Sequence, residues 1–179
     1  MRRHDPGRRD RIVEVTLELI AEVGVAGLSH RGIARRADVP LGSMTYHFDG
    51  MDDLLRTAFT RFAERFSASY AAHFAEVGAR EEAVSAIVAL IRELSADAGM
   101  RDNIVAYELY TLAARDPAYR EITGRWMAVS RSELERWFAG DVARQLDALI
   151  EGFALHGALD VAPLEIGVVE SAVRRLVGA

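Results

Sequence analysis

Hydrophobic residues recur every three or four positions along most of the chain, which is the spacing of one face of an α-helix. The clearest first case is residues 8–23, where Ile12, Leu17 and Ile20 share a face and Gly24 ends the pattern. The same spacing predicts later helices over residues 51–77, 81–97, 102–115, 118–139, 141–159 and 163–177. No useful length of sequence alternates in the two-residue period of a β-strand, so we predict an all-α fold with about nine helices.

Residues 29–48 are predicted to form two short helices joined by a tight turn. Ser29 can cap the first helix with its hydroxyl, and Ile33 begins its buried face. Asp38 tolerates the left-handed conformation that a sharp turn needs. Pro40 suits the first turn of the second helix, because its missing N–H would be unpaired there. This is a helix-turn-helix, and its second helix has the right size for a DNA major groove.

Small or polar side chains near the start of the second helix are the candidates for base contacts: Leu41, Gly42, Ser43 and Thr45. The hydroxyls can bond to base edges, Leu41 can add an apolar contact, and Gly42 lets the backbone approach closely. In the preceding helix, Ser29 and Arg31 can bind phosphate. The second helix contains no Arg or Lys, so a bidentate guanine contact is excluded there and specificity would depend on methyl contacts, hydroxyls, water and DNA shape.

The helix-turn-helix resembles the DNA-binding domain of the TetR family of transcriptional regulators in Ile33, Ala34, Ala37, Val39, Gly42, Tyr46, His47 and Phe48. The resemblance covers roughly residues 8–55. It implies that Tyr46 and His47 touch phosphates, although His47 could instead brace the turn. It also implies a DNA-binding domain over residues 1–66 and a C-terminal ligand-binding and dimerisation domain over residues 67–179. Such a protein would bind a palindromic operator as a homodimer and release it when a small apolar effector binds.

Three positions depart from the family pattern. Thr45 stands where the family often has an aromatic residue, and Asp38 replaces a common glycine. Met51 stands where the family often has a lysine near a phosphate, so we expect that contact to be absent here.

The charge distribution fits a DNA-binding N-terminal part better than the net charge of -5 does. Residues 1–50 hold eight Arg and seven acidic residues, a net of +1, and residues 51–179 have a net of -6. Five arginines lie in the opening segment: Arg2, Arg3, Arg8, Arg9 and Arg11. They form either a basic arm that follows phosphates or a minor groove, or a disordered solubilising tail.

The last two predicted helices, over residues 141–177, are apolar on more than one face. One helix buries only one stripe against its own chain, so the second stripe needs another partner. Two such pairs from two chains would form a four-helix bundle, as the family resemblance also implies. The alternative is a helix that is fully buried within one chain.

Aromatic and methionine side chains cluster in the middle helices: Phe62, Phe66, Tyr70, Tyr107, Tyr110, Trp126 and Met127. They could line an effector pocket together with Glu108 or His156, or they could simply form the core. If Glu108 is buried, a cationic or hydrogen-bonding effector is favoured.

Other classes of function find little support. The chain has no cysteine, no HExxH, no GxSxG, no Gly-rich phosphate loop and five scattered histidines, so we expect neither an enzyme nor a metal or cofactor site. No signal peptide and no apolar run of about 20 residues is present, so a cytoplasmic protein without a membrane contact is expected. The alternatives to a repressor are an activator of the same family and a helical adaptor that binds only protein.

Overall fold

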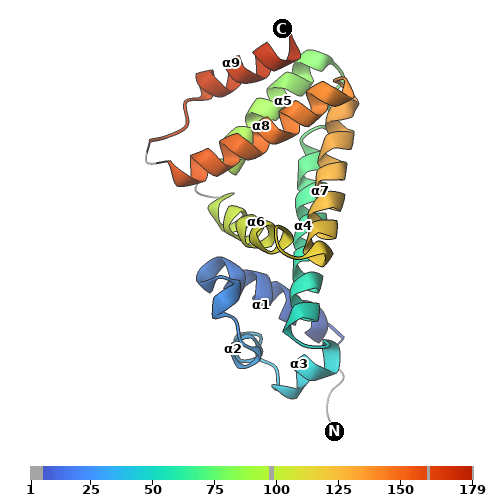
Figure 1. Cartoon of the computed structure of the whole chain (residues 1–179), viewed down its shortest axis with the longest axis vertical. Coiled ribbons are helices and arrows are strands. Elements are labelled where there is room, and N and C mark those ends of the chain that lie inside the picture. The colour runs from blue at the N-terminus through green and yellow to red at the C-terminus, as the bar shows by residue number, and fades with distance from the viewer. Residues whose placement is uncertain (1–5, 97–98, 161, 179) are drawn as a thin grey trace. The chain divides into compact units, whose positions relative to one another are not determined.

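A computed structural model describes residues 6–96, 99–160 and 162–178, and every regular element in these ranges is helical (Figure 1). The elements are α1 (Arg8–Val23), the 3₁₀ turn η1 (Val25–Gly27), α2 (His30–Arg36), α3 (Gly42–His47), α4 (Met51–Ala72), α5 (Arg80–Leu94), α6 (Met100–Ala113), α7 (Pro117–Glu135), α8 (Gly140–Leu159) and α9 (Ile166–Val177). For the described residues, the predicted all-α fold with about nine helices is confirmed.

The start and end of α1 are as predicted, whereas α4 is shorter than predicted. Gly24 ends α1 with φ 70°, and its N–H donates to the Ile20 carbonyl at 2.9 Å. The prediction that α4 reaches residue 77 is wrong, because the chain after Ala72 tightens into three-residue turns. One of these turns, in which the Phe74 N–H donates to the Ala71 carbonyl, buries Phe74 completely in the core.

Several other helix boundaries also move by a few residues. Pro40 lies before α3 rather than in its first turn, and its carbonyl accepts a 2.8 Å bond from the Ser43 N–H. The end of α7 lies at Glu135 rather than at residue 139, and α9 begins at Ile166 rather than at residue 163. These shifts come from local turns that apolar periodicity does not encode.

The chain divides into two compact units, and α4, α6 and α7 contribute to both. The first unit consists of Met1–Ala63 and Ile104–Ile122, and the second of Glu64–Asn103 and Thr123–Ala179. The predicted division into domains 1–66 and 67–179 stays a prediction. None of the described helices has the length and apolar character needed to cross a membrane.

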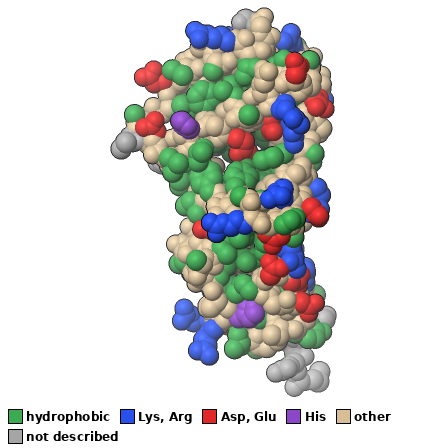
Figure 2. Space-filling model, viewed as in Figure 1, with side chains coloured by type: hydrophobic (Ala, Val, Ile, Leu, Met, Phe, Trp, Pro, Cys, Tyr) green, Lys and Arg blue, Asp and Glu red, His purple; other side chains and the backbone are tan. Residues whose placement is uncertain are grey.

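Each unit has a core of its own. In the first unit, α1 to α4 bury an apolar set that includes Ile12, Ile20, Ile33, Met44, Phe48, Leu54 and Phe59. In the second unit, α4, α5, α7, α8, α9 and the turn after α4 bury a set that includes Tyr70, Phe74, Ile87, Ile91, Leu134, Leu146, Ile150, Val169 and Val173. Charged side chains of both signs are interspersed on the face of the molecule in Figure 2.

Asp38 is the only described residue other than glycine with a positive φ, 51°, as the turn between α2 and α3 was predicted to require. A β-branched side chain is poorly accommodated in this conformation. We expect Asp38→Val to lower the free energy of unfolding by about 1–2 kcal/mol, measured by urea denaturation. Asp38→Asn, whose side chain also tolerates left-handed backbone, should leave the stability nearly unchanged; equal losses would show that the turn is unstrained.

Candidate nucleic-acid interface

The helix-turn-helix is assembled from a capped helix and a left-handed turn. Ser29 has extended backbone, and its Oγ accepts a 3.1 Å hydrogen bond from the Gly32 N–H, which confirms the predicted cap of α2. After α2, the Val39 N–H returns to the Ala34 carbonyl at 3.0 Å around the left-handed Asp38. The turn therefore fixes where α3 begins relative to α2.

Apolar side chains hold the two short helices in the core of the first unit, where α2 packs against both α1 and α3. Ile33, Ala34 and Ala37 are buried on α2 and its C-cap, and Met44 and Phe48 are buried on and after α3, as predicted. With these faces inward, the opposite sides of α2 and α3 are left for contacts outside the chain.

The starts of α2 and α3 line one open groove of about 690 Å³. Its lining residues are Ser29, His30, Arg31, Leu41, Gly42, Met44 and Thr45. The structure thus brings together five of the eight residues predicted to contact DNA. His30 is an addition that sequence reasoning missed, although its position beside the Ser29 cap was a signal for it.

The remaining three predicted contact residues differ in exposure. Tyr46 is 81% exposed on α3, so its ring and hydroxyl face solvent. Ser43 is only 6% exposed, because it lies on the inward side of α3 with Met44. Its burial runs against the expectation that the Ser43 hydroxyl meets a base edge, and its N–H is already bonded to Pro40.

His47 is half-buried at the end of α3, and its ring packs edge-on against Tyr46 with 4.8 Å between centroids. Burial, followed by the positive charges of Arg8 and Arg9, lowers the pKa of His47 below its ordinary value. The imidazole is therefore neutral at pH 7, which favours the bracing role over a charged contact with phosphate.

The opening arginines that the structure describes belong to α1 rather than to a free tail. The Arg9 guanidinium lies 5.1 Å from the centroid of the Phe48 ring. Arg11 Nε donates to the Ala37 carbonyl at 3.1 Å. These side chains brace the helix-turn-helix, whereas Arg2 and Arg3 lie outside the described residues.

Arg36 also braces this unit. Its guanidinium forms two hydrogen bonds with the Glu22 carboxylate, at 2.5 and 3.2 Å, and so joins α2 to α1. Arg31 and Arg35 are both exposed on α2, but only Arg31 lines the groove.

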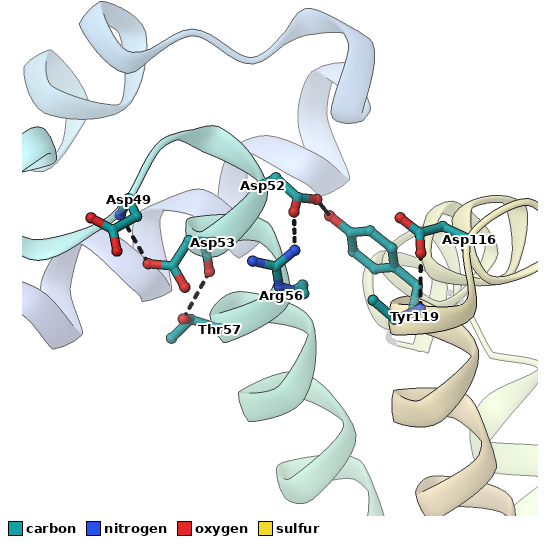
Figure 3. A network of polar contacts seen from close by, with 8 residues as sticks. Asp49, Asp52, Asp53, Arg56, Thr57, Asp116 and Tyr119 are labelled. Atoms are coloured by element: carbon teal, nitrogen blue, oxygen red, sulfur yellow. Dashed lines mark hydrogen bonds and ion pairs between the residues drawn. The ribbon is translucent and has the colours of Figure 1, made fainter.

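A polar network fixes the start of α4 directly after the helix-turn-helix (Figure 3). Asp53 Oδ2 accepts the Asp49 N–H at 3.0 Å, which caps the entry to α4. Asp52 lies between Arg56, one turn further along α4, and the buried hydroxyl of Tyr119 on α7, which donates to Asp52 Oδ1 at 2.7 Å. Sequence reasoning missed this bond because Asp52 and Tyr119 are 67 positions apart.

The six predicted effector-binding residues are distributed over both units. Phe62 is buried and Tyr107 and Glu108 are half-buried in the first unit. In the second unit, Trp126 is buried, Phe66 and Met127 are half-buried, and the rings of Phe66 and Trp126 lie 4.8 Å apart.

Glu108 does not meet the condition that would have favoured a cationic effector. It is only half-buried, and its Oε1 lies against the backbone of Gly24 at the end of α1. His156, the other polar candidate, is exposed on α8. Neither side chain identifies an effector.

The two helices predicted to dimerise differ from each other. On α8, Leu155 and Leu159 are exposed, so a second apolar stripe is present. On α9, Val169 and Val173 are buried, whereas Glu170 and Arg175 are exposed, so Val168 is the main apolar residue of the outer side. The expectation of several apolar faces therefore holds for α8 and is wrong for α9. Hydrophobic side chains do reach the surface of this unit (Figure 2).

No group of three or more His, Cys, Asp or Glu side chains within the described ranges is placed to hold a metal ion.

Family models match both parts of the chain. The model described as "Bacterial regulatory proteins, tetR family" matches residues 12–58, and "Tetracyclin repressor-like, C-terminal domain" matches residues 78–179.

Solved structures resemble the whole chain. A transcriptional regulator, SCO7518 from Streptomyces coelicolor A3(2), is 50% identical, with 97% of this chain and 100% of that chain covered and a TM-score of 0.91. The multidrug binding protein EbrR complexed with ethidium is 31% identical, with 95% and 98% covered and a TM-score of 0.78.

Among curated relatives, the uncharacterized HTH-type transcriptional regulator Rv2912c of Mycobacterium tuberculosis is 29% identical over 111 residues. This match covers 62% of this chain and 55% of the relative, so it spans just over half of that protein. The HTH-type transcriptional regulator BetI of Escherichia coli O139:H28 is 27% identical, with 95% of this chain and 92% of the relative covered.

Removing the Tyr119 hydroxyl should loosen the start of α4. We expect Tyr119→Phe to lower the free energy of unfolding by about 1–2 kcal/mol, because Asp52 loses a buried hydrogen-bond donor and keeps Arg56. Urea denaturation measures this loss. Tyr46→Phe is the matched control, since that hydroxyl faces solvent, and an equal effect of the two changes would contradict a structural role for the Tyr119 bond.

Proposed function

Because the chain belongs to the TetR family of DNA-binding transcriptional regulators, we propose that it is a repressor that binds a palindromic operator as a homodimer and is released by a small molecule. The family consists of regulators and not of enzymes, and SCO7518, Rv2912c and BetI are named as transcriptional regulators. A protein of this kind acts where the chromosome lies, so we place it in the cytoplasm.

The groove between the starts of α2 and α3 is the observation that carries the DNA-binding part of this proposal. Arg31 and Ser29 on one side supply a guanidinium and a hydroxyl for phosphate. Leu41 and Thr45 on the other side supply an apolar surface and a hydroxyl for base edges. Apart from the neighbouring residues and the backbone of α3 itself, no atom lies within 4 Å of the place of a Gly42 Cβ, so α3 is open to a ligand at that point.

The chemistry of α3 limits how it reads sequence. Gly42–His47 contains no Arg or Lys, and His47 is held neutral. Tyr46, which is largely exposed, can donate its hydroxyl to a phosphate and place its ring along the backbone. The half-site is therefore chosen through thymine methyl groups, hydroxyls, bridging water and DNA shape.

The homodimer is proposed to form through α8, with a smaller contribution from α9. Ala148, Gly152, Leu155 and Leu159 follow one face of α8, and there is open space beside the Cα of Gly152. A stripe of small residues followed by exposed leucines lets two copies of α8 approach closely around a two-fold axis. Val168 extends this surface onto α9.

The effector is proposed to be a small, largely apolar aromatic molecule. EbrR, 31–33% identical to this chain in these structures, has been solved in complex with ethidium, with proflavin and with malachite green. An effector acts by binding one arrangement of the dimer's two helix-turn-helix units more tightly than the arrangement that fits the operator. It lowers operator affinity by the ratio of its two affinities and by no more. In this chain, α4 begins directly after the helix-turn-helix and extends into the second unit. We therefore propose that α4 transmits the effect of effector binding to the helix-turn-helix.

Selection of bound fragments from genomic DNA by the purified full chain, at two salt concentrations, tests the proposal. A repressor of this kind should enrich a palindrome with two half-sites one turn, or a multiple of one turn, apart. Binding that enriches no sequence and disappears at the higher salt would leave only phosphate attraction and would favour the protein-binding adaptor instead.

Arg31 and Arg35 allow a matched test on the selected operator. We expect Arg31→Ala to weaken binding by about tenfold and to reduce the slope of log affinity against log salt by about one, because one phosphate contact is lost. Arg35→Ala removes an equal charge from the same helix outside the groove and should change the affinity much less. Equal losses would show that only the net charge of α2 matters.

Leu155 and Val129 allow a matched test of the dimer, since each is 39% exposed. We expect Leu155→Glu on α8 to convert the dimer to a monomer in sedimentation and to reduce operator binding with it. Val129→Glu on α7 should leave the dimer intact. A Leu155→Glu protein that sediments as a dimer would contradict an interface through α8.

A further inference from the structure

The Tyr70 hydroxyl is a buried polar group that its surroundings do not satisfy. Tyr70 lies on α4 within the core of the second unit and is 3% exposed, and its oxygen has no hydrogen-bond partner among the described residues. Buried polar atoms in native proteins nearly always have a partner, and one without a partner costs free energy. A ligand that bonds to this hydroxyl would recover that cost.

The charged groups that act most strongly on this hydroxyl are carboxylates. Burial, followed by the negative charges of Asp147 and Glu151 on α8 and of Glu133 on α7, raises the pKa of Tyr70 above its ordinary value. The phenol is therefore neutral and lies in a negative field. Such a field attracts a cation and repels an anion.

Asp147 is a largely buried carboxylate within this cluster. Its side chain is 15% exposed, and burial raises its pKa to about 6, although the charges of Arg131 and Arg144 act in the opposite direction. Arg131 Nε lies 3.7 Å from Asp147 Oδ2 and donates instead to the Met127 carbonyl at 2.9 Å. Asp147 thus has a nearby cation but no close hydrogen bond from it.

An aromatic wall lies one helical turn from the hydroxyl. Phe66 precedes Tyr70 by four residues on α4 and so shares its face. The rings of Phe66 and of Trp126 on α7 are inclined at 59°, with 4.8 Å between their centroids. Aromatic faces attract organic cations and accept flat apolar groups.

We propose that Tyr70, Asp147 and Glu151, with the Phe66 and Trp126 rings, form a subsite for the positively charged nitrogen of an aromatic amine. The hydroxyl oxygen accepts from the ligand N–H, the carboxylates balance its charge, and the rings hold its flat part. A cationic amine fits better than a metal ion, because a neutral phenol is a poor metal ligand and the rings supply a large apolar surface. This inference rests on the proposed function only in treating the ligand as the effector.

Fluorescence titration of the full chain with proflavin, a planar aromatic cation, at pH 7.5 tests the subsite. We expect Asp147→Asn to weaken proflavin binding by about tenfold, as the loss of a charge-assisted contact does. Tyr70→Phe, which removes one oxygen, should weaken it by about threefold. The matched control is Asp141→Asn, which removes an exposed carboxylate from the first turn of α8 and should bind like the parent.

The pH dependence gives a second readout. Above pH 6 Asp147 is charged and attracts proflavin, and below pH 6 it takes up a proton and loses that attraction. Parent affinity should therefore fall between pH 7.5 and pH 5, and the fall should be much smaller in Asp147→Asn. Arg131 on α7 and Arg144 on α8 are the charged groups that act on Asp147, and Tyr70, Glu133 and Glu151 belong to the same cluster.

Thermal unfolding shows whether the Asp147→Asn variant is folded. It also shows how much the charge of Asp147 destabilises the protein when no ligand is bound. Because the pKa of Asp147 is raised on folding, its charged form destabilises the empty protein above about pH 4 and most fully above pH 6. Asp147→Asn should therefore melt at a higher temperature than the parent at pH 7.5, with little difference near pH 4.

Three outcomes would overturn the subsite: no proflavin binding by the parent, equal binding by the parent and Asp147→Asn, or tighter binding of the anionic dye fluorescein. Each of these leaves the proposed regulator intact as long as the empty parent protein binds a selected palindrome. Failure of that DNA selection, with cation binding as expected, would instead overturn the proposed function and leave the subsite standing.

Discussion

The structure of the N-terminal part depends on one constraint: α3 has six residues and no stability of its own. A helix this short is not stable in water, because the conformational entropy lost on forming its first turn exceeds the stabilisation from that turn's hydrogen bonds. Met44 and Phe48 are buried in the core of the first unit, and the Arg9 guanidinium of α1 lies over the Phe48 ring. The reading helix therefore exists only as part of this packed unit.

The same unit is joined by ion pairs that connect α1 to its neighbours. Arg36 bonds Glu22, and Arg61 on α4 bonds Asp10 while approaching Glu14. These pairs are largely exposed, and exposed pairs contribute at most about 1 kcal/mol each. They fix the relative orientation of the helices, whereas the buried apolar side chains supply most of the stability.

Local features of this fold were predictable from the sequence, and long-range ones were not. The Ser29 cap, the left-handed Asp38 and the inward Met44 each follow from a residue type at a position within one or two turns. The burial of Ser43 depends on how α3 is rotated about its own axis within the core. The six residues of α3 alone do not determine that rotation. Likewise, no local signal joins Asp52 to Tyr119.

The effector-side predictions show the same division. Aromatic residues at helical spacing identified Phe66 and Trp126 as neighbours of a possible pocket, and the structure places their rings together. The sequence did not identify the buried polar groups. Glu108 and His156 were predicted to lie in the pocket, but nothing in the sequence distinguishes them from other polar residues. The unpartnered Tyr70 hydroxyl and the buried Asp147 become visible only when α4, α7 and α8 are seen packed.

The contact between Glu108 and Gly24 has a consequence for how this sequence can change over time. A Cβ at position 24 would lie 2.7 Å from Glu108 Oε1, and the backbone there has φ 70°. Both features oppose a larger residue at position 24, but the Glu108 carboxylate is the far end of a flexible side chain that can move aside, whereas the backbone conformation stays strained for any residue other than glycine. Shortening residue 108 therefore leaves the main barrier in place, and descendants of this chain should keep glycine at position 24 whatever residue stands at 108.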